Sequence, residues 1–404
     1  MEPIEKQVTV LMQGSEFGDT QIKEMMTQEL RQRLTEASKE GRPLEVYCGY
    51  DVTAPDLHVG HTITMRKLRQ FQDFGHNVTF VIGTFTTLIG DPSDRDEART
   101  VQTMEQIEAN ARTYTDQAFK ILDRQKTTVR FNYDWLSKLT FADVIKAASY
   151  FTVQQMLTRD RLRNRWDANK PLGLHELLYP LAQGYDAVHL HSDVQIGATE
   201  QLFNLMAGRK LQESFGQKPQ VCITFPVLVG TDGTDRMSKS RGNYIGITEA
   251  PEVQYGKAMS IPDSIIIQYF RLLTNLYTDE ELAKLEQQMS GGAIHPMELK
   301  KRLAREIVTQ LNDKQAADEA EAQFEKVVQK KEVPEVMTLG TKSNRTPLLD
   351  YLVENSLARS LSEARRLIKE GAIYIDNARV TDAHLEVKPG MEIRRGSRHY
   401  IRAT

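Results

Sequence analysis

The chain of 404 residues contains only two cysteines, Cys48 and Cys222, and neither belongs to a Cys-x-x-Cys pair. Their scarcity argues against a disulfide framework and a structural zinc site, and it favours a reducing, cytoplasmic setting. No stretch approaches the roughly 20 consecutive apolar residues that a transmembrane helix needs. Residues 1–6 also lack the basic stretch and apolar core of a secretory signal. No membrane partner is therefore expected.

An excess of charge of one sign is also lacking, since the formal net charge is only −3. This balance gives no global sign of nucleic-acid binding. The charge is uneven, however, because residues 341–404 hold 12 Lys or Arg against 8 Asp or Glu, a net charge of +4. Residues 1–340 therefore carry −7. A basic end on an acidic body indicates a polyanionic partner that contacts one end of the protein.

Short β-rich runs alternate with longer helical patterns over nearly two hundred residues. This alternation predicts an α/β fold with a Rossmann-like, doubly wound parallel sheet covered on both faces by helices. The expected strands are residues 45–50, 78–83, 129–133, 187–191 and 220–229. The expected helices are residues 20–40, 58–74, 100–124, 141–165, 175–185 and 197–215. Ligands bind beyond the carboxyl ends of such strands, so residues that follow strand ends should lie together.

The chain is too long for one ordinary core, and its pattern changes twice after the predicted sheet. We expect a catalytic domain with N-terminal helices at residues 1–246 and an α-helical domain at residues 247–335. A linker at residues 336–344 and a small α+β domain at residues 345–404 follow. The last domain should contain two short helices, 347–355 and 362–369, and a β-rich end.

Two histidines open one of the predicted helices in the segment His58-Val59-Gly60-His61. A spacing of three places both imidazoles on one side of the first turn, and Gly60 lets a ligand approach the backbone. A helix N-terminus favours anions, and imidazole donors could follow charge that develops on phosphate oxygens. Ordinary surface histidines at a helix start explain this segment, taken alone, equally well. A zinc site is less favoured, because no third ligand stands at a suitable spacing.

A second segment, Arg236-Met237-Ser238-Lys239-Ser240, follows a run rich in glycine and aspartate. Loops of this composition can close on a ligand, and Arg236 and Lys239 would bring positive charge to a departing pyrophosphate. In isolation, a solvated charged loop is the better explanation. Together with the histidines, however, the loop could hold a triphosphate from two sides of one crevice. The pair of segments therefore predicts a nucleotide-activating site.

The two segments together resemble the class I aminoacyl-tRNA synthetases, and more closely the bacterial tyrosyl-tRNA synthetases. The resemblance is carried by residues 47–61, 89–93, 179–186 and 195–201, and it extends from about residue 30 to the end. It implies ATP-dependent activation of L-tyrosine to tyrosyl-adenylate, followed by transfer to the terminal ribose of tRNA(Tyr). No covalent enzyme intermediate is implied.

The resemblance also implies roles for individual residues. Tyr47 and Asp186 would give the phenol hydroxyl a donor and an acceptor, so that phenylalanine would leave both without a partner, a discrimination for which tyrosyl-tRNA synthetases are the standard example. The implied tyrosine site contains Tyr47, Asp91, Tyr179, Gln183, Asp186 and Gln201. The implied catalytic residues are His58, His61, Arg236, Lys239, Arg95 and Arg99. The implied ATP site contains Gly49, Asp51, Thr53, Gly60, Gly197, Glu200, Val229 and Ser240.

The substrates implied are L-tyrosine, ATP with Mg²⁺, and tRNA(Tyr), with no protein-bound metal or organic cofactor and no DNA partner. A homodimer whose tRNA crosses between subunits is also implied. Residues 345–404 resemble the alpha-L type RNA-binding domain. Its expected RNA contacts are Arg345, Arg365, Arg366 and Lys369, of which the last three share one helix face. The basic run 160–165 could border either the dimer interface or the tRNA acceptor arm.

Four positions depart from the family's usual pattern: Val52 replaces Pro, Ala198 replaces Gly, Glu200 replaces Asp and Arg236 replaces Lys. Three of them affect the expected ATP site, where the geometry of donors and acceptors changes. They keep open a tRNA-binding paralogue with lost activation activity. A tryptophan-specific relative is a nearer alternative, against which Tyr47 and Asp186 argue. A nucleotidyltransferase built on the histidine segment alone would leave the basic C-terminal part unexplained.

Overall fold

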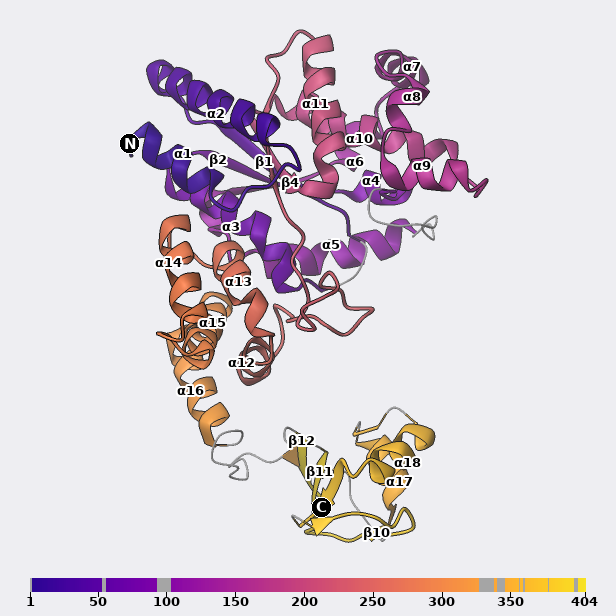
Figure 1. Cartoon of the computed structure of the whole chain (residues 1–404). Helices are drawn as coiled ribbons and strands as arrows, with labels where there is room; N and C mark the ends of the chain where they lie inside the picture. Colours follow the sequence, from indigo (N-terminus) through magenta and orange to yellow (C-terminus); the bar gives the residue numbers. More distant parts are fainter. Residues whose placement is uncertain are drawn as a thin grey trace. The chain divides into compact units, whose positions relative to one another are not determined.

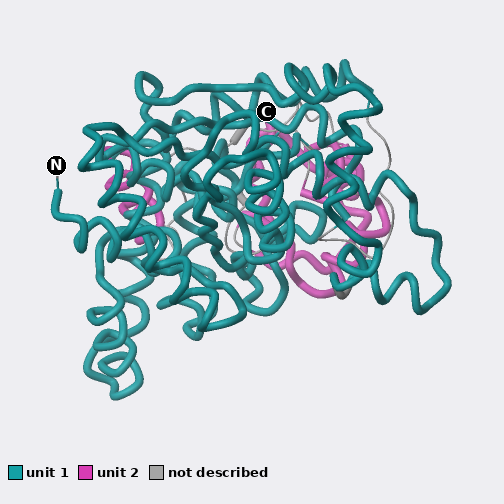
Figure 2. The backbone as a smooth tube through the Cα atoms, turned by 90° about the horizontal axis from the view of Figure 1, so that it is seen from above, with its two compact units in different colours: residues 1–313 teal, residues 314–404 magenta. Residues whose placement is uncertain are grey.

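The computed structural model describes residues 2–52, 56–92, 103–326, 338–339, 346–355, 357–358, 360–376, 378–395 and 399–404. The chain forms two compact units, residues 1–313 and residues 314–404, which are coloured separately in Figure 2. The expected boundary at residue 247 falls inside the first unit, where it stays a prediction.

A five-stranded parallel sheet lies at the centre of the first unit (Figure 1). Its strands are β1 (Glu45–Tyr50), β2 (Asn77–Ile82), β3 (Thr127–Phe131), β4 (Val194–Ala198) and β5 (Val221–Phe225). They are arranged in the order β3-β2-β1-β4-β5, and every neighbouring pair is parallel. The winding direction reverses between β1 and β4, whose carboxyl ends therefore border a crevice. The predicted doubly wound sheet is confirmed.

Helices cover both faces of this sheet. The helix α3 contacts β1, β2 and β4, whereas α11 contacts β4 and β5 and packs along α10 on the other side (Figure 1). The helices that surround the sheet are α1 (Ile4–Met12), α2 (Thr20–Glu40), α3 (Val59–Asp73), α4 (Thr84–Ile89), α5 (Met104–Ala118), α6 (Tyr133–Leu136), α10 (Leu174–Leu190) and α11 (Leu202–Ser214), with the 3₁₀ turns η1 (Arg124–Lys126) and η2 (Thr199–Gln201).

One expected strand is wrong, because residues 187–191 continue helix α10 and do not enter the sheet. The strand at this position is β4, which begins three residues later at Val194. A five-residue apolar run fits the buried end of a helix as well as it fits a strand. His191 ends α10 in the left-handed region, with φ of 48°, and Asp193 then pairs with Arg33 and Arg42 before β4 begins.

The single helix expected at residues 141–165 is also wrong. Three short helices replace it: α7 (Phe141–Ala148), α8 (Val153–Met156) and α9 (Asp160–Asp167). Thr140 and Thr152 each start a new helix with a capping box, in which the threonine hydroxyl accepts from the backbone three residues later. The cap at Thr152 makes a second helix start more favourable than continuation of the first.

After residue 250, the first unit is mainly helical, as the sequence predicts. It consists of α12 (Pro251–Met259), η3 (Asp263–Ile265), α13 (Ile266–Leu273), α14 (Asp279–Ser290) and α15 (Pro296–Leu311). Helix α13 contacts α3, and the ammonium group of Lys120 donates to the carbonyl of Leu311 at 2.9 Å. None of the described helices is both long and apolar enough to cross a membrane.

The second unit combines a small sheet with short helices, and the expected α+β fold is confirmed. Strands β6 (Thr338–Leu339), β12 (His399–Arg402), β11 (Glu392–Arg395), β8 (Ile373–Ile375) and β9 (Ala378–Arg379) form one sheet in that order. Strands β7 (Thr346–Pro347) and β10 (Glu386–Val387) form another. The helices are α16 (Lys314–Phe324), α17 (Leu348–Glu354) and α18 (Leu361–Lys369). Leu352, Leu367, Ile373 and Ile393 contribute to the apolar core.

Candidate active site

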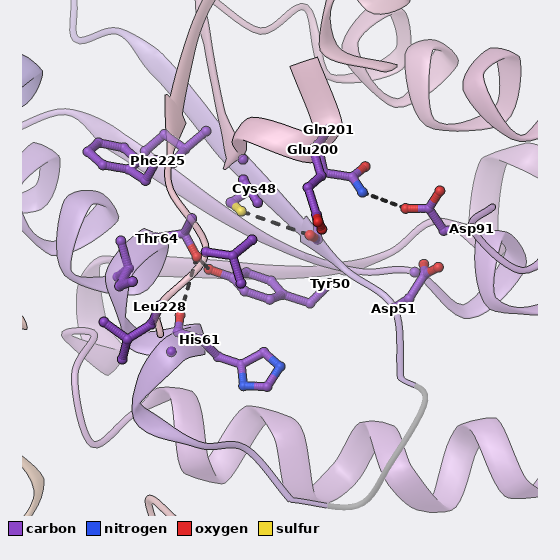
Figure 3. A pocket seen from close by; sticks show the side chains of 18 of the residues that line it. Cys48, Tyr50, Asp51, His61, Thr64, Asp91, Glu200, Gln201, Phe225 and Leu228 are labelled. Carbon is purple, nitrogen blue, oxygen red and sulfur yellow. Dashed lines mark hydrogen bonds between the residues drawn. The ribbon is translucent and has the colours of Figure 1, made fainter. Parts of the chain in front are cut away.

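A cavity of about 520 Å³ opens at the carboxyl ends of β1 and β4. It brings together most of the described residues that the sequence assigns to the site: Gly49, Asp51, His58, Gly60, His61, Asp91, Tyr179, Gln183, Asp186, Gly197, Glu200, Gln201, Arg236, Lys239 and Ser240. Figure 3 shows Gln201 directed at Asp91 on one side, and His61 on the other. Thr53, Arg95, Arg99 and Arg345 lie outside the described residues.

The carboxylate of Asp186 lines this cavity and is held by two buried side chains. The indole Nε1–H of Trp135 donates to Oδ1 of Asp186 at 2.8 Å, and Nδ2 of Asn132 donates to Oδ2 at 3.3 Å. Burial raises the pKa of Asp186 to about 8, an effect that the two donors oppose and the charge of Asp51 increases. Asn132 and Trp135 are not among the residues expected from the sequence, although Asn132 directly follows β3 and so obeys the strand-end rule.

Tyr47 is almost fully buried beside Asp186, with 1 % of its surface exposed. Tyr47 is not among the residues that line the cavity, and within the described part of the chain its hydroxyl makes no hydrogen bond of good geometry, although the Gln220 side chain is near enough to lower its pKa slightly. Burial, and then the charge of Asp186, raise the pKa of Tyr47 well above its usual value. A hydroxyl buried without a partner costs roughly 1–3 kcal/mol, so this position favours a ligand with a polar atom at its end.

Amides and carboxylates line the middle of the cavity. Nε2 of Gln201 donates to Asp91 at 2.5 Å, while Nδ2 of Asn204 donates to the side-chain oxygens of Gln183 and Gln201, at 3.0 and 2.9 Å. The fully buried Asn204 therefore orients two expected tyrosine-site residues at once. Its position three residues after Gln201 is the signal that the sequence analysis overlooked.

Asp51 was expected in the ATP site and Tyr179 in the tyrosine site, yet their side chains form a hydrogen bond. The hydroxyl of Tyr179 donates to Oδ2 of Asp51 at 2.9 Å, and the hydroxyl of Thr86 donates to Oδ1 at 2.7 Å. Nδ2 of Asn132 donates to Thr86 at 3.1 Å, which extends this network to Asp186. A Cβ atom at Gly83 would lie 2.4 Å from both the Asp51 carboxylate and the Thr86 hydroxyl, so only glycine leaves room for the network.

His58 and His61 occupy the first turn of α3 as expected. The backbone N–H of Gly60 donates to Nδ1 of His58, and the backbone N–H of His58 donates to Nδ1 of His61, each at 3.2 Å. Since Nδ1 of His58 accepts, the remaining proton of its neutral imidazole is on Nε2. Nδ1 of His61 also lies 3.3 Å from the carbonyl oxygen of His58, to which it can donate. Burial lowers the pKa of His58 to about 2 and that of His61 to about 4, and the nearby charge of Lys239 adds to both shifts. Both rings are therefore neutral, and His58 is an Nε2–H donor.

The loop that carries Arg236 and Lys239 is fixed beside the histidines. The N–H of Val59 donates to the carbonyl of Ile245 at 2.9 Å, which joins the start of α3 to the end of the loop. The ammonium group of Lys239 lies 3.0 Å from the Asp56 carboxylate. Nη1 of Arg236 lies 3.8 Å from Glu200, so two positions that depart from the family pattern contact each other.

Asn243 organises this loop from its end, a role that the sequence analysis did not predict. Its Oδ1 accepts from the N–H of Ser238 at 2.8 Å, and its Nδ2 donates to Asp232 at 2.6 Å. A Cβ atom at Gly230 would collide with the Asn243 amide. Val229 was expected at ATP, but the neighbouring Leu228 lines the cavity, and the Val229 carbonyl accepts from the Tyr269 hydroxyl at 2.7 Å.

The basic run at residues 160–165 divides into two parts. Arg165 is buried and forms a bidentate pair with Glu176, at 2.6 and 3.0 Å, while Arg163 pairs with Asp167 at the surface. Arg161 instead lines a second cavity, of about 360 Å³. The residues around this cavity are Pro92, Thr158, Arg159, Arg161, Leu162, Thr199, Glu200 and Phe203. Glu200 lines both cavities, which therefore adjoin each other.

The expected RNA-binding residues of the second unit lie on α18. Arg365, Arg366 and Lys369 are all exposed. The Arg366 guanidinium lies 3.9 Å from both Glu363 and Glu370, so its pairing is loose. The exposed face of α18 is accordingly basic and accessible to a polyanion.

The class that this fold and site define is confirmed by comparison with known proteins. The family described as tRNA synthetases class I (W and Y) matches residues 39–329, and the chain belongs to this family. Residues 323–402 match the domain described as the Tyrosine--tRNA ligase SYY-like C-terminal domain.

Individual relatives carry a more particular name. A Tyrosine--tRNA ligase of Dehalococcoides mccartyi is 48 % identical over 90 % of this chain and 92 % of its own length. One from Moorella thermoacetica is 46 % identical over 99 % of this chain and 96 % of its own length. A truncated mitochondrial tyrosyl-tRNA synthetase of Aspergillus nidulans has a similar fold, with a TM-score of 0.62 at 21 % identity, and the match covers 80 % of this chain and 94 % of that structure. The resemblance seen in the sequence is confirmed.

Proposed function

We propose that this chain activates L-tyrosine with ATP and transfers the tyrosyl group to tRNA(Tyr). One observation carries the proposal. A single cavity joins the buried carboxylate of Asp186, close to the unpartnered Tyr47 hydroxyl, to the neutral histidines and the Lys239 ammonium at its other end. A phenol, an amino acid backbone and a triphosphate can be accommodated along it in that order. The near-full-length similarity to enzymes named Tyrosine--tRNA ligase supports the same assignment.

The first reaction is the attack of the tyrosine carboxylate on the α-phosphorus of ATP, in which the bond to pyrophosphate breaks. The Nε2–H group of His58 donates to phosphate oxygens as their charge grows, and the neutral His61 ring lies beside it, with ring centroids 4.0 Å apart. Lys239 exchanges Asp56 for the departing pyrophosphate, to which Arg236 also brings positive charge. Mg²⁺ enters with ATP as part of the substrate. Catalysis then consists of positioning and charge stabilisation, and it needs no nucleophilic side chain.

Exchange of labelled pyrophosphate into ATP tests the first reaction. Tyrosine should drive the exchange, and phenylalanine should not replace it, because a ligand without a hydroxyl leaves the Tyr47 hydroxyl without a polar partner and gives no donor or acceptor to Asp186. Each amino acid is assayed in turn with the full chain. Exchange driven only by tryptophan would refute the tyrosine specificity. Exchange with none would favour the paralogue that has lost activation activity.

The second reaction needs the end of the tRNA beside the activated carboxyl group. The second cavity adjoins the first at Glu200 and is lined by Arg161, by Phe203, and by Arg159, whose guanidinium carbon lies 5.1 Å from the centroid of the Phe203 ring. Guanidinium groups suit phosphates, and an aromatic surface suits an unstacked base. We therefore assign this cavity to the single-stranded acceptor end, whose terminal ribose hydroxyl attacks the carbonyl carbon and releases AMP.

Arg161→Ala and Arg163→Ala provide a matched test of this assignment. Both arginines belong to α9, and both substitutions remove one positive charge, but only Arg161 lines the second cavity. Arg161→Ala should lower kcat/KM for tRNA in the charging reaction about 10-fold, since it removes a phosphate contact. Arg163→Ala should change it less than 2-fold. Equal effects of the two substitutions on charging, or a loss of pyrophosphate exchange with Arg161→Ala, would contradict the assignment.

A homodimer is supported by the distribution of exposed apolar side chains. Of the 12 large exposed hydrophobic residues described, 7 fall between residues 131 and 174, where Phe141 is 81 % and Leu174 is 75 % exposed. Apolar groups gathered in this way mark association surfaces more often than solvated ones. We propose that a second copy covers this region, on β3 and α6 to α10. The exposed basic face of α18 then supports contact with the tRNA outside its acceptor end.

A further inference from the structure

Trp135 is held by two residues of the same helix. Asp186 accepts the indole Nε1–H at 2.8 Å. His189, three positions later on α10, stacks on the same indole, with ring centroids 4.5 Å apart and an angle of 10° between the planes. Residues three positions apart lie on one side of a helix. Helix α10 therefore contacts the indole twice, through Asp186 at its N–H edge and through His189 on its ring face. Trp135 itself is only 4 % exposed, whereas His189 is exposed.

Arg130, on the edge strand β3, completes this cluster from outside. Its guanidinium carbon lies 5.4 Å from the centroid of the Trp135 ring, and its Nη2 lies 3.4 Å from Nε2 of His189. Burial lowers the pKa of His189, and the charges of Arg130, His191 and Lys138 lower it further, whereas Asp134 opposes them. The imidazole is therefore neutral near pH 7, and its Nε2 faces the guanidinium as an acceptor.

The position of the indole matters because it determines how the Asp186 carboxylate is presented. Each oxygen of Asp186 receives one donor from the protein, Trp135 at Oδ1 and Asn132 at Oδ2. A carboxylate oxygen has a second lone pair, which remains for a ligand hydroxyl. If the indole could tilt, the carboxylate could turn with it, and water could take the position of the ligand hydroxyl.

We propose that His189, which lies outside the cavity, is a positioning residue that sets the discrimination between tyrosine and phenylalanine. Discrimination against a ligand that lacks a hydroxyl is large only where the buried polar groups cannot find another partner. By fixing Trp135, the His189 ring keeps Asp186 in the orientation that a phenol satisfies and a phenyl ring does not. This inference rests on the proposed tyrosine-activating function.

The test is His189→Ala, measured by pyrophosphate exchange with tyrosine and with phenylalanine in the full chain. The aromatic contact supports a 3- to 10-fold effect. KM for tyrosine should rise by this factor with kcat nearly unchanged, and the ratio of kcat/KM for tyrosine to that for phenylalanine should fall by a similar factor. A purely structural role would lower kcat/KM for both amino acids equally and leave the ratio unchanged, which would overturn the proposal.

Three further variants make the result specific. His189→Phe keeps an aromatic face on the indole and should restore the ratio, whereas His189→Gln keeps a polar head without that face and should not. His175→Ala is the matched control, because His175 is an exposed histidine on the same helix. Failure of His189→Phe to restore the ratio, or a similar change with His175→Ala, would also overturn the proposal.

Fluorescence gives a readout that does not depend on turnover. The chain has two tryptophans, and Trp166 is 56 % exposed, so a Trp166→Phe background leaves Trp135 as the only reporter. Tyrosine should change the Trp135 emission in this background, and His189→Ala should alter the emission before tyrosine is added. An emission that is identical with and without His189 would contradict the stacking. If the parent protein shows no tyrosine-dependent exchange, the proposed function fails, and the emission still tests the cluster.

Discussion

Replacement of Asp186 by Asn should stabilise the folded protein at alkaline pH while it removes most tyrosine activation. The folded-state pKa of Asp186 is raised to about 8 from 3.8, chiefly by burial. A carboxyl group with a raised pKa is most favourable to folding below its unfolded pKa, and this contribution is lost as the pH rises towards the folded pKa. The wild-type protein therefore loses stability between about pH 4 and pH 8 through this group, and an amide does not titrate.

Urea unfolding of both proteins from pH 5 to pH 9 measures this effect. The stability difference in favour of Asp186→Asn should grow with pH and reach about 2–5 kcal/mol at pH 8, an order-of-magnitude value from the linkage between pKa and stability. Tyrosine-dependent exchange should fall about 100-fold in kcat/KM, since the amide replaces one of the oxygens that can accept from the phenol with an N–H donor. If the stability difference between the two proteins did not vary with pH, the pKa of Asp186 would not be raised by its burial.

Asp193→Asn is the matched control because its effect should have the opposite sign. Burial alone would raise the pKa of Asp193, but hydrogen bonds from Arg42 and from the N–H of Glu45, with the charges of Arg42 and Arg33, lower it. This carboxylate therefore stabilises the folded state above pH 4, and an amide at the same position should be destabilising. Asparagine should therefore stabilise the folded protein at position 186 and destabilise it at position 193, seven residues later.

Replacement of His58 by Ala should lower kcat for pyrophosphate exchange about 100-fold. The Nε2–H of His58 is a fixed donor at the phosphate end of the cavity. Loss of one such donor typically lowers kcat about 100- to 1,000-fold. Because the pKa of His58 is lowered to about 2, the ring stays neutral, and the wild-type rate should show no titration of this imidazole between pH 5 and pH 8. Single-turnover formation of the adenylate measures both effects.

His295→Ala is the control for the structural part of this change. His295 caps α15 as His58 caps α3, with its Nδ1 accepting the N–H two residues later at 3.1 Å. Both substitutions remove a helix cap and should cost about 1 kcal/mol of stability. Only His58→Ala removes a donor from the cavity. A similar loss of rate with His295→Ala would mean that the helix cap, not the imidazole donor, accounts for the effect.

Most of the site is predictable from the sequence because one physical rule places its residues at the same edge of the sheet. Parallel strands direct their carboxyl ends to one edge, so the residues after β1, β4 and β5 meet there despite their separation in the chain. The same rule applied to Asn132, directly after β3, would have added it to the site. The wrong strand at 187–191 has a local cause, since an apolar run of five residues has no period that distinguishes a strand from a helix end.

Other parts of the site could not be predicted, because they depend on contacts between distant elements. The approach of the Trp135 indole to Asp186 joins residues 51 positions apart and requires the packing of α6 on α10. Gly83 is a similar case, because a side chain at this position is excluded only by the side chains of Asp51 and Thr86, which pack against it in the folded protein. The spacing of Asn204 from Gln201 indicates one of its partners, but nothing nearby in the sequence identifies Gln183 as the other. Asn243 orients a backbone group that its immediate sequence does not identify.

The two ends of the loop at residues 231–243 are hydrogen-bonded to each other, so the loop can be lengthened by protein engineering. The N–H of Thr231 donates to the carbonyl of Asn243 at 2.9 Å, so the two ends meet before the chain rejoins the fold. Doubling the length of such a loop costs only about 0.6 kcal/mol in closure entropy. A short tag inserted near Asp235 should therefore cost little closure entropy, although it would break the hydrogen bond from the N–H of Gly230 to the carbonyl of Asp235. It would also attach a dye to a segment beside the triphosphate, where loop movement during turnover could be recorded directly.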